Sequence, residues 1–279
     1  MPVIRLEYRN VTMRFADAKG SGPLTAVRGV SFAVHDAEVV SLIGPTGCGK
    51  STLLNIGSGL TIPSEGSAFV DGDRVIGPSA QVAFMLQKDL LLPWRTVAEN
   101  VMFGVEIQGI PVKERRRRAA ALLAGFKLAE FSGHYPHQLS GGMRQRVALA
   151  RTLAVDPHVL LLDEPFSAVD AQTRMVLQKD LAQTLKAANK TALLITHDLA
   201  EAVTLSDRVL VMSRRPGTII DEIAIDLPQR NNPMARRREA RFGDYVAQLM
   251  DRLDIAHVAI DGAPQGAPEP EGQGAEAAP

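Results

Sequence analysis

Short apolar runs bounded by glycine, proline or charged residues recur along the chain. Runs of four to six such residues are typical of strands buried on both faces of a largely parallel sheet, although periodicity alone also allows short buried helices. Between the runs, Leu177, Leu181 and Leu185 recur at the four-residue spacing of a helix. This alternation predicts an α/β fold, with a mostly parallel sheet between helices. The predicted strands are Val39–Ile43, Gln81–Leu86, Val159–Leu162, Ala192–Ile195 and Val209–Met212.

Two regions depart from this alternation. Near the start, the β-rich pieces Val3–Tyr8 and Val27–Val34 are separated by a turn at Gly20–Pro23, which predicts an N-terminal antiparallel β layer. Residues 94–157 contain no good strand and are rich in Ala, Leu, Arg and Glu. We expect an inserted α-helical subdomain there.

The C-terminal part has a different composition. After Pro228 we expect a basic helix from Arg236 to Leu253. Residues 262–279 contain only Gly, Ala, Pro, Glu and Gln, which cannot bury a core, so we expect a disordered tail. The predicted division is a main domain over 1–230, an extension over 231–261 and the tail over 262–279.

Composition and charge restrict the class of protein. The chain has 279 residues, of which 46% are hydrophobic and 22% charged, enough for a buried core. The formal net charge of +0 disfavours a globally basic nucleic-acid binder. Residues 254–279 hold five acidic residues and no Lys or Arg, so 31 basic residues face 26 acidic ones elsewhere.

The sequence also suggests where the protein works. Cys48 is the single cysteine, which excludes an internal disulfide and fits a reducing compartment. The first eight residues lack the apolar segment of a secretory signal, and no stretch approaches the roughly 18 apolar residues of a membrane span. We therefore expect a soluble protein whose role at a membrane depends on a partner.

One segment matches the phosphate-binding loop pattern G-x-x-x-x-G-K-[ST]. It follows the strand Val39–Ile43 and precedes a helical stretch from Thr52 to Leu60, which is the context that the motif requires. The glycines allow backbone N–H groups to converge on phosphates, and the helix start adds its positive dipole end. The side chain of Lys50 suits the β- and γ-phosphates, and the Ser51 hydroxyl suits Mg²⁺. The segment is Gly44, Pro45, Thr46, Gly47, Cys48, Gly49, Lys50 and Ser51.

Two further motifs carry candidate chemistry. The apolar strand from Val159 ends in Asp163 and Glu164, which places one carboxylate to organise Mg²⁺ and the next to polarise a water molecule. Before a helical run that ends at Ala154, Ser140 is a good N-cap, and the two glycines after it leave the first N–H groups uncovered. An ordinary capped helix is the alternative for this second segment.

Together these motifs resemble the ATP-binding cassette (ABC) family of transporter ATPases, over about residues 3 to 225. The family's Walker A loop matches residues 44–51, its signature Leu139–Gln145 and its Walker B strand residues 159–164. A Q-loop glutamine (Gln87), a D-loop (Ser167–Asp170) and a switch histidine (His197) follow in the family's order, and Phe15 stands where an aromatic ring stacks on adenine.

The resemblance implies a P-loop NTPase core and a role for each residue. It implies ATP and Mg²⁺ as ligands, with Glu164, His197 and Gln87 catalytic and with Ser51, Gln87 and Asp163 around the metal. It also implies a head-to-tail homodimer in which Asp170 holds the interface. The implied nucleotide contacts are Phe15, the loop from Gly44 to Ser51, Thr52, Ser140, Gly141, Gly142 and Asp170.

Two short segments are similar to the nitrate, sulfonate and taurine importer ATPases. They are Leu90–Trp94 and Ser213–Gly217. This similarity implies uptake of a small anion through a separate membrane permease, with an extracytoplasmic solute-binding protein as an indirect partner. The chain would then lie at the cytoplasmic side of the inner membrane, as a peripheral protein that binds no nucleic acid. Trp94 is either a core anchor of the helical subdomain or part of a groove that receives the permease.

Other functions have different requirements. An ABC exporter or lipoprotein-release ATPase would share all the catalytic motifs, and only the two importer-like segments argue against it. A chromosome or repair ATPase would need a long heptad arm or zinc cysteines, and a module that binds ATP without cleaving it would lack Glu164 or His197. The run Arg115–Arg118 cannot form one helical face, so a solvated, membrane-proximal surface is favoured there over a nucleic-acid patch.

Overall fold

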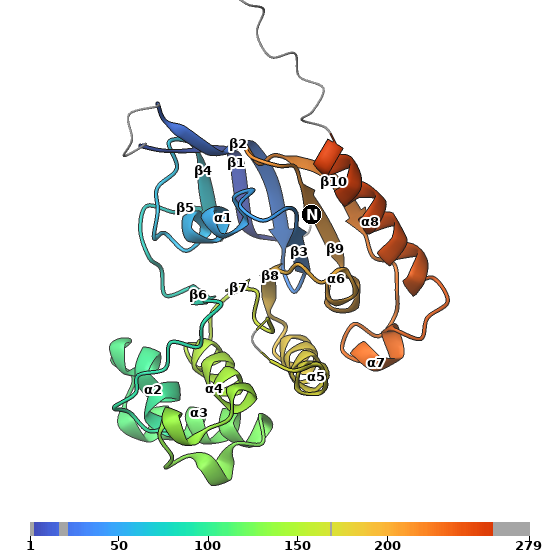
Figure 1. The fold of residues 1–279 in the computed structure, drawn as a ribbon. Coiled ribbons are helices and arrows are strands. Elements are labelled where there is room, and N and C mark those ends of the chain that lie inside the picture. Colours follow the sequence, from blue (N-terminus) through green and yellow to red (C-terminus); the bar gives the residue numbers. More distant parts are fainter. Residues whose placement is uncertain (1–2, 17–21, 168, 259–279) are drawn as a thin grey trace, which may run out of the picture.

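The computed structural model describes residues 3–16, 22–167 and 169–258, and Figure 1 shows a fold with two sheets and a helical lobe. The smaller sheet is antiparallel in the order β2-β1-β4-β5, which contains the predicted N-terminal β layer. The predicted turn at Gly20–Pro23 lies partly outside the described residues. The last two strands were not predicted, because polar residues and Gly66 interrupt their pattern. The strands are β1 (Ile4–Phe15), β2 (Leu24–His35), β4 (Glu65–Val70) and β5 (Asp73–Arg74).

The larger sheet has six strands in the order β10-β9-β3-β8-β7-β6. Five of them are parallel, as predicted, while β10 pairs antiparallel with β9. The five predicted strands all occur, with ends that differ by one residue at most. The strands are β3 (Val39–Ile43), β6 (Val82–Met85), β7 (Val159–Asp163), β8 (Thr191–Ile195), β9 (Arg208–Met212) and β10 (Ile219–Ala224).

The helices divide between the sheet and a separate lobe. Next to the sheet lie α1 (Lys50–Gly57), α5 (Ala171–Ala187) and α6 (Leu199–Leu205). The lobe is formed by residues 94–157, which hold three α-helices and no strand (Figure 1). They are α2 (Val97–Ile107), α3 (Val112–Gly125) and α4 (Gly141–Ala154), with the 3-10 turns η1 (Ala129–Phe131) and η2 (Pro136–Gln138) between α3 and α4.

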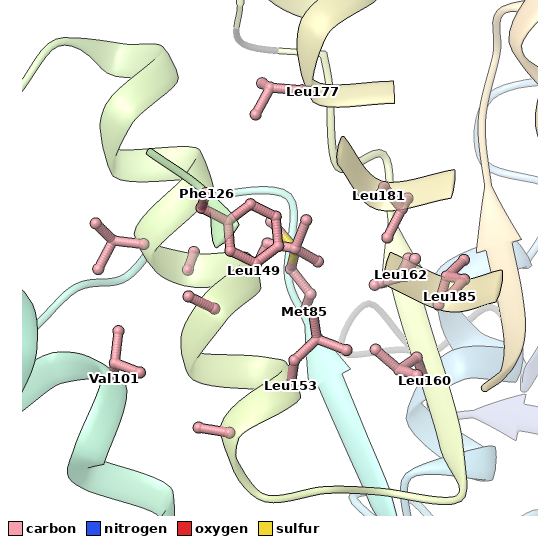
Figure 2. Close-up of a cluster of buried hydrophobic side chains, with 14 of the residues drawn as sticks. Met85, Val101, Phe126, Leu149, Leu153, Leu160, Leu162, Leu177, Leu181 and Leu185 are labelled. Carbon is pink, nitrogen blue, oxygen red and sulfur yellow. The ribbon is translucent and has the colours of Figure 1, made fainter. Parts of the chain in front are cut away.

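A single hydrophobic cluster joins the lobe to the sheet, as Figure 2 shows. Val101 of α2 and Leu149 of α4 belong to it, together with Leu160 of β7 and Leu181 of α5. A second cluster fills the space between the two sheets and around α1. Because side chains of the lobe pack directly against β7 and α5, the position of the lobe is coupled to the position of these elements.

The C-terminal segment corrects one prediction. The start of the predicted basic helix is wrong: α7 (Pro233–Arg236) ends at Arg236, where the helix was expected to begin. The helix α8 (Phe242–Val258) covers the later part of the predicted range and ends five residues beyond Leu253. Arg236 is 1% exposed, and its guanidinium donates to four carbonyl oxygens, so it belongs to the interior. The acceptors are the carbonyls of Thr204, Ser206, Ile225 and Leu227.

The α8 helix packs on the sheet edge. Tyr245 and Leu249 are buried with Ile43 of β3 and Val203 of α6 in a third cluster. In the described part of the chain, no helix is long and apolar enough to cross a membrane. The predicted disordered tail, residues 262–279, lies outside the described residues.

Candidate nucleotide site

A cavity of about 330 Å³ opens between the smaller sheet and the start of α1. The phosphate-binding loop forms its floor, and Phe15 of β1 and Leu24 of β2, which are 42% and 47% exposed, lie at its apolar side. The cavity therefore combines an apolar wall with a loop suited to phosphates, as a nucleotide requires. Its lining is Phe15, Leu24, Ala26, Thr46, Gly47, Gly49, Lys50, Ser51, Thr52, Glu164 and Arg215.

The loop leaves the start of α1 without a side-chain cap. Gly49 takes the N-cap position with φ of 107°, and a Cβ atom there would lie 2.4 Å from Val27 Cγ1. A side chain at this position would be strained and would not fit, so the first N–H groups of α1 stay uncovered by any cap. The Lys50 ammonium donates to the carbonyls of Gly44 and Pro45, at 2.7 and 3.0 Å.

Cys48 lies within the loop but outside the cavity lining. Its side chain is 1% exposed, and burial raises the pKa of its thiol. Because its side chain is buried, the predicted contact of Cys48 with the nucleotide would be made by its backbone. The carbonyls of Gly44 and Pro45 accept hydrogen bonds from Lys50, so these two residues also contribute to the site through their backbone.

Asp163, the last residue of β7, meets Ser51 at the first turn of α1. The two side chains form a hydrogen bond, which lowers the pKa of the Asp163 carboxyl, but burial acts more strongly and raises it. In nucleotide sites, Mg²⁺ is bound by a hydroxyl, a carboxylate and phosphate oxygens, and Ser51 and Asp163 supply the first two. The residues present therefore fit the metal.

Three predicted catalytic side chains come together at the carboxyl ends of the strands. Glu164 Oε2 accepts a hydrogen bond from Gln87 Nε2 at 3.1 Å and lies 3.2 Å from His197 Nδ1. Glu164 itself has a φ of 45°, an uncommon value for a residue with a side chain, and its N–H donates to the carbonyl of Ile195 at 3.0 Å. Strained backbone of this kind is concentrated at functional sites.

A family model described as ABC transporter matches residues 27–167, just over half of the chain. The chain belongs to the ABC transporter family. It is 42% identical to an uncharacterized ABC transporter ATP-binding protein of Methanocaldococcus jannaschii, over 90% of this chain and 91% of that protein. This membership confirms the predicted family and its ATP-binding ATPase domain.

Other relatives and a solved structure agree. The chain is 41% identical to the nitrate import ATP-binding protein of a Synechocystis strain, over 90% of this chain and 95% of that protein. It is 44% identical to the taurine import ATP-binding protein of Burkholderia pseudomallei, over 89% and 96%. A dimeric, post-hydrolysis ATP-binding cassette bound to ADP and Pi superposes with a TM-score of 0.70, at 31% identity over 79% of this chain and 98% of that one. These similarities confirm the predicted fold class.

The ABC signature segment lies apart from this cavity. The Ser140 hydroxyl caps α4 by accepting the N–H of Met143 at 3.3 Å, and Ser140 and Gly141 are exposed. Asp170 caps α5 by accepting the N–H of Thr173 at 3.0 Å, and hydrogen bonds to Thr173 lower the pKa of its carboxyl. Within one chain, these predicted nucleotide contacts do not join the Walker A residues.

Several side chains at the site were not predicted. Leu24, Ala26 and Arg215 line the cavity. Ser167, which was named only as the first residue of the D-loop, has its Oγ 3.4 Å from Gln87 Nε2. The Ser213–Gly217 motif pointed to Arg215, but only as an importer-like feature.

The segment after Gln87 is attached to the helical lobe. Arg144 binds the Asp89 carboxylate at 3.0 Å, and Arg151 donates to the carbonyls of Asp89 and Leu90 at 2.6 and 2.7 Å. Through these bonds, the two arginines of α4 hold the chain that leads away from Gln87. These contacts could not be predicted from residue spacing.

Two surface predictions are also settled. Trp94 is 72% exposed, so its interpretation as a core anchor is wrong. The arginines of α3 pair with two acidic residues: Arg115 lies 3.6 Å from Glu106, while Arg117 and Arg118 both bind Glu114. This agrees with the prediction that the arginines do not form one basic face.

Proposed function

We propose that this chain is the ATP-hydrolysing subunit of an ABC importer for a small anion. The observation that carries the proposal is the convergence of Gln87, Glu164 and His197 beside the Walker A cavity. A carboxylate held by two neighbours, next to a phosphate-binding loop, is suited to general-base catalysis of hydrolysis.

The reaction follows from this geometry. The ammonium of Lys50 exchanges the loop carbonyls for the β- and γ-phosphate oxygens when ATP enters. Glu164 accepts a proton from a water molecule as the water oxygen bonds to the γ-phosphorus, and the bond from that phosphorus to the ADP oxygen breaks. Gln87 and His197 hold the carboxylate of Glu164 toward the water.

Mg²⁺ would be held by Ser51 and Asp163, with Gln87 hydrogen-bonded to the adjacent Glu164, and would neutralise charge on the phosphates when bound. Among residues 3–16, 22–167 and 169–258, no group of three or more His, Cys, Asp or Glu could hold a metal alone. We therefore propose that the phosphates complete the coordination.

The signature segment supports a shared site. Ser140 and Gly141 are exposed, Gly142 is half-buried, and none of the three lines the Walker A cavity of its own chain. We propose that two copies close head to tail, so that this segment and Asp170 of one copy face the Walker A loop of the other. The dimeric cassette with the same fold supports a dimer.

The direction of transport rests on the relatives. Two of them are named as nitrate and taurine import proteins, which favours a small anion and an importer over the exporter alternative. The exposed side chains of Leu90 and Trp94 offer a surface for membrane permease subunits. The chain would then lie at the cytoplasmic side of the membrane, with a solute-binding protein as an indirect partner.

The catalytic assignment is tested with Glu164→Gln. We expect ATP binding to be retained, while turnover falls by on the order of 10²-fold or more, the effect of a lost general base. Nucleotide affinity and steady-state phosphate release are measured on the same preparations. Turnover near that of the parent would remove Glu164 from its role.

A further inference from the structure

The turn between β9 and β10, residues Ser213–Gly217, is fixed against the phosphate-binding loop. The N–H of Gly217 donates to the Ala26 carbonyl at 2.9 Å, and the N–H of Arg28 donates to the Gly217 carbonyl at 3.0 Å. A Cβ atom on Gly217 would lie 2.0 Å from the carbonyl oxygen of Cys48, so the two backbones are in direct contact. The turn is thus attached both to β2 and to the loop.

Ser213 fixes the turn internally. Its hydroxyl accepts the N–H of Thr218 at 3.0 Å and donates to the carbonyl of Arg214 at 2.9 Å. Ser213 is buried, whereas the two arginines that follow it are exposed. A long side chain on this turn therefore starts from a fixed position.

Arg215 extends from this turn to the nucleotide cavity. It lines the cavity with Phe15, Gly47 and Lys50, and its Nη2 atom lies 3.5 Å from the place that a Cβ atom on Gly47 would take. Among the residues that the structure describes, none forms a hydrogen bond or an ion pair with Arg215. An unpaired guanidinium thus lies beside the middle of a loop that binds phosphates.

We propose that Arg215 is a further nucleotide-binding residue, whose guanidinium binds the phosphate chain of the nucleotide on its own chain's Walker A loop. A guanidinium offers two parallel N–H donors that match phosphate oxygens. Its place beside Gly47 favours the phosphates, while Phe15 and Leu24 provide the apolar wall for the base. The inference rests on the proposed function, because it requires nucleotide in this cavity.

The test compares full-length proteins that all carry Glu164→Gln, so that ATP is not consumed. Arg215→Ala removes the guanidinium, Arg215→Lys keeps the charge without the planar fork, and Arg214→Ala is the matched control. Arg214 is the neighbouring exposed arginine and does not line the cavity. ATP and inorganic tripolyphosphate, which has no base, each compete with a fluorescent ATP analogue, and melting curves check folding.

We expect Arg215→Ala to raise the Kd of both ATP and tripolyphosphate by about tenfold, the effect of losing one charge-assisted hydrogen bond in an open site. Arg215→Lys should recover part of the affinity, and Arg214→Ala should stay within about twofold of the parent, as surface charges do at a distance.

Other outcomes overturn the proposal in distinct ways. Unchanged affinities in Arg215→Ala would remove the residue from the site. A loss of affinity for ATP but not for tripolyphosphate would mean that Arg215 contacts the nucleoside. An equal loss of affinity in Arg214→Ala would mean that general surface charge, and not a specific contact of Arg215, supports binding. Failure of the Glu164→Gln parent to bind ATP would instead contradict the proposed function itself.

Discussion

Two helices of this protein, α1 and α4, have glycines at their starts, and the sequence predicts an anion site at each. They are built differently. No side chain caps α1, whose start lies in the cavity with Lys50 and Ser51. The start of α4 is capped by Ser140 and is exposed. The cavity at the start of α1 therefore includes Glu164, whereas the pocket that Gly141 lines at the start of α4 does not.

The difference shows what a glycine contributes at each place. At α1, Gly49 is required because its φ is positive and Val27 occupies the space of a side chain. At α4, a Cβ atom on Gly141 would meet nothing closer than Arg144 Nη2 at 3.9 Å. We infer that the first glycine serves the fold of its own loop, whereas the second leaves room for a partner.

The largest effect is expected from Gly49→Ala compared with Gly141→Ala. The first change forces a left-handed conformation on Ala and a clash with Val27, which should displace the loop and weaken ATP binding at least roughly 100-fold. Gly141→Ala should leave ATP binding by a single chain within about twofold, because its methyl group has space. Calorimetric titration with ATP measures both, and melting curves confirm that each variant folds.

Equal losses in the two glycine variants would contradict the comparison. They would mean that the start of α4 binds nucleotide in its own chain. Loss of folding in Gly49→Ala would be visible in the melting curve. Gly47→Ala then serves as a second variant in the loop, because φ is also positive there but the nearest atom to a Cβ would be Arg215 Nη2 at 3.5 Å.

A smaller effect is expected on dimer formation, which should depend on the start of α4. In the Glu164→Gln protein, Ser140→Arg should leave ATP binding by one chain intact and weaken Mg·ATP-driven dimerisation at least about tenfold, because a bulky side chain enters the place for the partner's phosphate. Ser140→Ala is the control: it removes the cap, which costs about 1 kcal/mol of helix stability, without adding bulk. Sedimentation of each protein with Mg·ATP measures dimer formation. Full dimerisation of the Ser140→Arg protein would contradict the head-to-tail arrangement.

A third helix start, that of α6, should respond to pH. Asp198 caps it by accepting the N–H of Glu201 at 3.0 Å, and the Glu201 side chain is buried, with Gln178 Nε2 donating to it at 3.2 Å. Burial raises the pKa of Glu201 to about 7, from 4.5 in an exposed chain, with Asp198 raising it and Arg174 lowering it. The folded protein then holds a proton that the unfolded chain has released, so stability falls as pH rises from about 4.5 to about 7.

Glu201→Gln removes this dependence. The melting temperature of the variant relative to the parent should rise between pH 5 and pH 8 by a few degrees, corresponding to at most about 3 kcal/mol. Glu130→Gln, at an exposed position, is the control and should show no such trend. A difference that stays constant with pH would mean that the Glu201 carboxyl is not held in its neutral form.

The parallel strands could be predicted from the sequence because burial on both faces leaves an uninterrupted apolar run. The same criterion missed β4 and β10, which are partly exposed and carry polar residues such as Glu65 and Asp221. Loop motifs were found by their spacing. The approach of Gln87 and His197 to Glu164 could not come from spacing, because they lie 77 and 33 residues away along the chain. The family resemblance implied only that the three residues are catalytic.

Charge was the least informative pattern. The sequence presents Arg115–Arg118 and Arg236–Arg238 as similar basic runs. The first lies on the surface of α3 with acidic partners, whereas Arg236 is enclosed and bound only to carbonyl oxygens. A run of like charges does not reveal which member finds buried acceptors, because those acceptors come from distant turns of the chain.

The bonds of Arg236 have a mechanical consequence. They secure the final turn of α6 through the carbonyls of Thr204 and Ser206, while Asp198 secures its first turn, next to His197. A short helix that is clamped at both ends cannot absorb strain by fraying. A displacement of His197 would therefore move α6 as a rigid body and displace the C-terminal helices α7 and α8 that contact it.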